Sequence, residues 1–78
     1  MKSYIVDDRT GEINQLGPYR SQSINSMVRK LLATEFKGYH TDVDIVDEVH
    51  AWIVINLPGG ARYEYEVGEI DEHGVGVD

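Results

Sequence analysis

Four carboxylates stand within seven residues of the chain, at Asp42, Asp44, Asp47 and Glu48. Clusters of carboxylate oxygens hold hard cations such as calcium, so this segment is the first candidate for site chemistry. A calcium loop of the EF-hand type also needs a glycine at its sixth position and a glutamate at its twelfth. Apolar residues intervene here without glycine. We therefore expect a solvated strand face and no metal site.

The other residue types with catalytic or ligand chemistry are scattered. No two of His40, His50 and His73 have the spacing that brings two imidazoles to one ion. Neither His40 nor His50 has a nearby serine arranged as a nucleophile motif, and the chain has no cysteine. Gly59-Gly60 is too short to cradle a phosphate. We predict a protein that is not an enzyme, with no catalytic residue, metal or cofactor.

Charge is distributed unevenly along the chain. Its 78 residues carry 14 acids against seven Lys plus Arg, a formal charge of -7. Residues 1–40 hold six bases and four acids, whereas residues 41–78 hold ten acids and only Arg62 as a base. Such a field attracts cationic partners and repels nucleic acid and anionic membranes.

The acids of the second half alternate with apolar residues, as in a strand with one exposed face. Residues two apart on a strand are about 6.6 Å apart, and neighbouring strands are about 4.8 Å apart. A lattice of negative charge is therefore predicted from Asp42, Asp44, Glu64 and Glu66.

The same alternation places Val46, Trp52 and Val54 among these acids. An exposed tryptophan ringed by charge is typical of an interface hot spot. The alternative interpretation is an acidic surface that serves only solubility, with Trp52 buried beneath the C-terminal tail. The predicted partner-binding residues are Asp42, Asp44, Asp47, Glu48, Trp52, Glu64, Glu66 and Glu69.

Length and composition exclude several classes of protein. With 41% hydrophobic residues the chain is too apolar for a disordered tail, and 78 residues are too few for a large enzyme. The longest apolar run, residues 51–55, is far shorter than the ~20 residues of a membrane helix. The N-terminus has no hydrophobic signal segment. We expect a soluble, cytoplasmic protein without disulfides.

The spacing of apolar residues predicts one helix over residues 21–38. Ser21 or Ser23 would cap its start, and Lys37 and Gly38 would lie at its end. Glu35 falls inside the apolar arc, so we expect the last turn to fray. The apolar stripe consists of Ile24, Met27, Val28, Leu31, Leu32 and Phe36.

The remaining chain has strand patterns. Residues 1–16 predict a first hairpin that Gly17-Pro18 ends, because proline lacks the N–H that a strand ladder requires. Residues 41–70 predict an acidic three-stranded meander, and residues 71–78 a mobile tail with Val75 and Val77 as a possible short edge strand. The result is a single α+β domain over residues 1–78, in the order ββαβββ, with the helix on one face of an antiparallel sheet. The strand residues expected in its core are Ile5, Val43, Ile45, Ile53, Ile55, Tyr63 and Tyr65.

In size, charge and lack of cysteine the chain resembles the small acidic inhibitors of phages and mobile elements, which include anti-CRISPR proteins and DNA mimics. That resemblance implies an acidic face that occupies the basic nucleic-acid-binding channel of a larger host protein. Two alternatives stay open. The chain could form a homodimer or larger oligomer through an edge strand or the Trp52 face. It could also bind nucleic acid weakly through Arg20, Arg29, Lys30 and Lys37.

Overall fold

The computed structural model describes residues 1–11 and 14–76, and over these it contains one helix and five strands. In chain order the elements are β1 (Lys2–Asp8), β2 (Gln15–Ser21), α1 (Ile24–Ala33), β3 (His40–Ile45), β4 (His50–Asn56) and β5 (Arg62–Ile70). This is the α+β fold with the order ββαβββ that the sequence predicts. None of the helices in the described ranges has the length and apolar character needed to cross a membrane.

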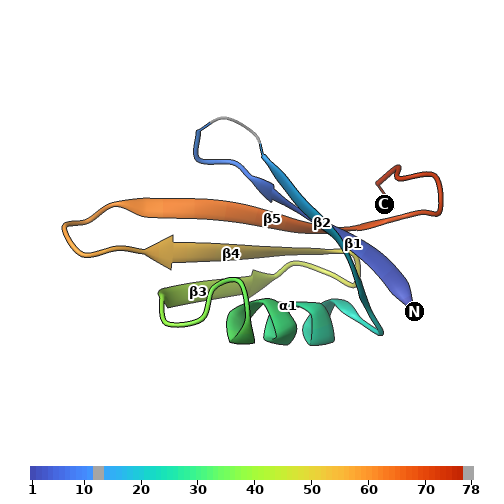
Figure 1. Ribbon diagram of the computed structural model, residues 1–78, viewed down its shortest axis with the longest axis horizontal. Helices are drawn as coiled ribbons and strands as arrows, with labels where there is room; N and C mark the ends of the chain where they lie inside the picture. Colours follow the sequence, from blue (N-terminus) through green and yellow to red (C-terminus); the bar gives the residue numbers. More distant parts are fainter. Residues whose placement is uncertain (12–13, 77–78) are drawn as a thin grey trace.

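The strands form one antiparallel sheet in the order β2-β1-β5-β4-β3. The meander β3-β4-β5 occupies one side of this sheet, and β5 pairs with β1 to attach the first hairpin. Figure 1 shows this hairpin crossing the direction of β5 and β4, with α1 running along the meander. The helix packs against β2 and β4, so it covers part of one face of the sheet.

Helix α1 is shorter than the predicted range 21–38. It begins after Ser23, whose hydroxyl accepts a hydrogen bond of 3.1 Å from the N–H of Ser26. It ends at Ala33, where the hydroxyl of Thr34 donates to the carbonyl oxygen of Lys30 at 2.7 Å. Residues 34–38 continue as turns, and Gly38 has a φ of +89° that favours glycine. Glu35 therefore lies outside the helix, in agreement with the expected fraying.

The core lies between α1 and one face of the sheet. The largest fully buried side chains are Tyr4, Val6, Met27, Leu31, Ile53 and Val67. The prediction of Ile5 as a core residue is wrong, because β1 buries Tyr4 and Val6 and the alternation turns Ile5 to the other face.

Three predicted core residues lie on the helix side of the sheet without being covered. Val43 pairs with Ile53, Ile45 with Ala51, and Tyr63 with Ile55. All three stay exposed because α1 packs on β2 and β4 and does not cover these positions.

The prediction that Gly17-Pro18 ends the second strand is wrong. Strand β2 runs through both residues, with Gly17 at a φ of +108° and a register shift opposite the stretch from Tyr4 to Val6. β2 is an edge strand, so its outer side needs no ladder bond and proline is tolerated there.

After β5 the chain turns back on itself. The side chain of Asp71 accepts hydrogen bonds from the N–H groups of His73 and Val75, each at 2.9 Å. An isolated antiparallel bridge then joins Ile70 to Gly76. Val75 is exposed beside this bridge, and Val77 lies outside the described residues.

Because α1 covers only part of the sheet, truncating each of two paired residues to alanine should cost different amounts of stability. Ile53→Ala removes a side chain with 0% exposure, so we expect a loss of about 2–5 kcal/mol in the free energy of unfolding. The control is Val43→Ala, at the position paired with Ile53 but 40% exposed, for which we expect no more than about 1 kcal/mol. Urea unfolding followed by circular dichroism measures both. Equal losses would contradict the described packing.

Candidate functional site

The strand register gathers four of the predicted acids on the face of the sheet that points away from α1. Asp44, Trp52 and Glu66 form one row across β3, β4 and β5, and Asp42, Val54 and Glu64 form the next. Directly paired residues point to the same face, and the intervening residues Ile53 and Tyr65 point to the helix side. We call these six residues the acidic face: Asp42, Asp44, Trp52, Val54, Glu64 and Glu66.

Each row of the acidic face has an apolar residue at its centre. Trp52 separates Asp44 from Glu66, and Val54 separates Asp42 from Glu64. The acids of one row are thus two strand spacings apart, about 9–10 Å. That distance is close to the Debye length of about 8–10 Å in physiological salt, so the repulsion between the acids of β3 and those of β5 is weak. The fold can therefore hold these charges on one surface at little cost.

Trp52 and Val54 are half-buried, so the centre of the acidic face is partly accessible to solvent. Asp42 and Asp44 are exposed, while Glu64 and Glu66 are half-buried. The sequence left the exposure of Trp52 undecided. Part of its surface remains accessible between two carboxylates.

The acids of β5 have cationic partners within the protein. A guanidinium nitrogen of Arg9 donates to Glu66 at 2.9 Å and also contacts Asp7 at 3.4 Å. Hydrogen bonding to Glu66 is the main cause that raises the pKa of Arg9. Arg62 contacts Glu64 at 3.3 Å. These exposed pairs are weak individually, but they offset part of the charge on this side of the acidic face.

The acids of β3 have no such partners. Asp42 accepts a hydrogen bond of 2.8 Å from the side-chain amide of Asn56, which is neutral. Within residues 1–11 and 14–76, no lysine or arginine lies within ion-pair distance of Asp42 or Asp44. The uncompensated charge of the acidic face is therefore concentrated on β3, which is an edge strand of the sheet.

Asp47 and Glu48 lie outside the acidic face, in the turn between β3 and β4. One oxygen of Asp47 accepts from the N–H groups of Val49 and His50, both at 2.8 Å. The first of these bonds is the largest cause that lowers the pKa of Asp47, and the charge of nearby His50 acts in the same direction. Asp47 thus closes the turn, and Glu48 lies near Ser23 and Ile24 at the start of α1.

Glu69 lies on the opposite face from Glu64 and Glu66. It pairs with the core residue Tyr4, and its largely buried carboxylate is 3.4 Å from the ammonium of Lys2. Burial raises the pKa of Tyr4, and the charge of Glu69 raises it further. Glu66 and Glu69 are three residues apart, and side chains alternate along a strand, so the sequence already places them on opposite faces.

Two residues beside the acidic face were not among those predicted. Asp7 pairs with Glu66 because β1 lies next to β5, and Arg9 bridges their carboxylates. One oxygen of the buried Asp7 has no hydrogen-bond partner among the described residues. No sequence signal pointed to this pairing, because β1 and β5 are more than fifty residues apart in the chain.

The described part of the chain holds no group of three histidine, aspartate or glutamate side chains that could bind a metal ion together. The bases considered for nucleic-acid binding do not all lie on one face either. Arg29 and Lys30 are exposed on α1, whereas Arg20 pairs with Ser3 on the sheet face that points away from the helix. Comparison with protein-family models, curated proteins and solved structures finds no match to the chain.

The hydrogen bonds of Asp47 predict a pH-dependent contribution to stability. A carboxylate whose pKa is lowered by folding stabilises the protein above its ordinary value of 3.8, and the effect is lost as pH falls through the lowered pKa. The control variant Asp47→Asn keeps an acceptor oxygen without the charge. We expect the wild type to have the higher urea midpoint at neutral pH and the difference to vanish on acidification. A difference independent of pH would contradict this role.

Proposed function

We propose that this protein is a non-enzymatic binding protein whose acidic face docks on a basic, nucleic-acid-binding surface of a larger protein. The observation that carries the proposal is the pair of uncompensated carboxylates, Asp42 and Asp44, beside the half-buried Trp52. Charge would bring the partner to this face, and the apolar centre would hold it.

Electrostatics favours a basic partner. The chain carries a formal charge of -7, and its unpaired acids lie on an open edge where they face solvent. Such a surface raises the rate of association with a cationic surface and repels nucleic acid. An association of this kind weakens as salt screens the exposed charges.

The centre of the acidic face suits an arginine-rich surface. A guanidinium can lie over the indole ring of Trp52 and donate two parallel hydrogen bonds to the carboxylate of Asp44. Arginine and lysine are also the residues that bind the phosphates of nucleic acid. A surface that accepts closely spaced phosphates would therefore accept the carboxylates of β3, and the protein would act as a competitor of nucleic acid. This is the inhibitor role implied by the resemblance to DNA mimics.

The acids on β3 disfavour self-association of this edge strand in the registers centred on residues 42–44. In an antiparallel pairing of β3 with a second copy, residues of the same face must stand opposite one another. A twofold axis at Val43 would then place Asp42 opposite Asp44, and an axis at either aspartate would place it opposite itself. Like charges in directly paired positions are destabilising. The acids on β3 thus disfavour a homodimer formed in this way.

Affinity capture from the native host, followed by mass spectrometry, tests the proposed function. We expect wild-type protein to capture a basic nucleic-acid-binding protein that is released by added duplex DNA or by raising the salt concentration. The double variant Asp42→Asn/Asp44→Asn should lose this capture without disturbing the ion pairs of Arg9 and Arg62.

The matched control is Asp71→Asn/Glu72→Gln, which removes the same charge from the turn after β5. It should retain the captured protein. Equal loss of capture in both double variants would mean that capture depends on the net charge of the protein and not on the position of Asp42 and Asp44. Capture that resists both DNA and salt would contradict the proposed function.

A further inference from the structure

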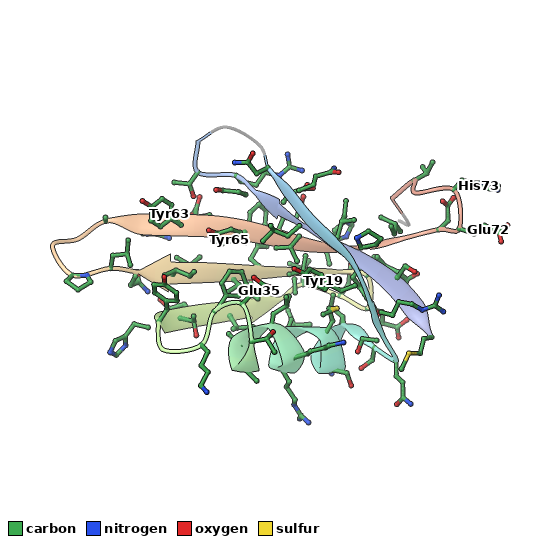
Figure 2. All side chains as sticks on the ribbon, in the orientation of Figure 1. Tyr19, Glu35, Tyr63, Tyr65, Glu72 and His73 are labelled. Atoms are coloured by element: carbon green, nitrogen blue, oxygen red, sulfur yellow. The ribbon has the colours of Figure 1, made fainter. Side chains whose placement is uncertain are left out.

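A groove opens on the helix side of the sheet, beyond the end of α1. Its volume is about 400 Å³. Four of its lining residues are aromatic, Phe36, Tyr39, Tyr63 and Tyr65, and Glu35 supplies a carboxylate. In Figure 2, Glu35 lies next to Tyr19 where β2 crosses, and Tyr65 and Tyr63 follow along β5. The groove and the acidic face therefore lie on opposite faces of the sheet.

The groove exists because α1 stops early. Phe36, in the turns that follow the helix, is buried, and the centroid of its ring lies 4.9 Å from that of Tyr65. Tyr63 and Tyr39 receive no such cover and are 42% and 52% exposed. The result is a set of aromatic rings in which the buried Phe36 and the half-buried Tyr65 form the base and two accessible rings form the rim.

Two carboxylates bring negative charge to the groove, because Glu35 lines it and Asp8 lies beside its Tyr65. Asp8 pairs directly with Tyr65 across β1 and β5, and its charge raises the pKa of Tyr65 in addition to the larger effect of burial. Burial is also the main cause that raises the pKa of Tyr19, followed by the charge and hydrogen bonding of Glu35. In the described part of the chain, no lysine or arginine lies within ion-pair distance of Asp8 or Glu35.

We propose that this groove binds an arginine side chain of a partner protein. A guanidinium is flat and weakly hydrated, so it stacks on aromatic rings. It also carries donors in a fork that matches the carboxylate of Glu35. A lysine ammonium has no flat face and is more strongly hydrated, and a nucleotide brings phosphates that both carboxylates repel.

This site is independent of the acidic face. Successive residues of β5 point to opposite faces, so Tyr63 lines the groove while its neighbour Glu64 belongs to the acidic face. A variant at one of these two positions therefore alters one surface and leaves the other. The two proposals can fail separately.

The test is an NMR titration with blocked pentapeptides, acetyl-Gly-Gly-Xaa-Gly-Gly-amide, in which Xaa is arginine, lysine or glutamine. We expect saturable shifts of the ring signals of Tyr39 and Tyr63 with the arginine peptide, weaker binding with lysine and none with glutamine. Glu35→Gln keeps the shape of its side chain and should weaken arginine binding about tenfold, because it removes the charged acceptor.

Glu64→Gln is the matched control, since it makes the same chemical change on the acidic face. It should leave the shifts that the arginine peptide induces at Tyr39 and Tyr63 unchanged. Equal affinity for the arginine and glutamine peptides would overturn the proposal, as would the absence of saturable shifts. If Glu64→Gln weakened arginine binding and Glu35→Gln did not, arginine binding would belong to the acidic face, and this result would also overturn the proposal.

Discussion

Burial of one sheet face against α1 is the constraint on which the rest of the structure depends. Ile53 and Val67 are fully buried on that face. Because side chains alternate along a strand, burying these two residues turns Trp52 and Glu66 outward, and antiparallel pairing adds Asp44 to the same row. A shift of one residue in the register would expose the core and bury the acids. The packing of the core thus fixes the composition of the acidic face.

The same limited helix accounts for both candidate surfaces. α1 ends at Ala33, too early to cover the whole sheet, and leaves the aromatic groove open beyond its end. On the other face no helix of the described residues packs, and the charges are distributed unevenly between the strands. Arg9 and Arg62 offset the acids of β5, while Asp42 and Asp44 on β3 remain uncompensated. Free negative charge therefore lies along the edge where a partner has access.

Local patterns predicted the helix and the strands of the meander, because each depends on a period within one element. The shared face of Asp42, Asp44, Glu64 and Glu66 followed from the alternation in each strand once consecutive strands were taken to pair. The contribution of β1 could not be predicted, since strand order depends on contacts between distant segments. Asp7 and Arg9 were missed for this reason. The choice of Ile5 for the core failed because consecutive apolar residues in β1 fit either face. Asp47 and Glu69 carry the right charge but have structural roles that only hydrogen bonds and register reveal.

Fluorescence quenching of Trp52, the only tryptophan in the chain, tests most directly whether acids surround it. Quenching constants for cesium and iodide are measured at low salt and normalised to free N-acetyl-tryptophanamide, with neutral acrylamide as a measure of access. We expect cesium to quench more effectively than iodide, and the preference to fall in Asp42→Asn/Asp44→Asn but not in Asp71→Asn/Glu72→Gln. Equal quenching by the two ions, or a preference for iodide, would contradict an acidic face centred on Trp52.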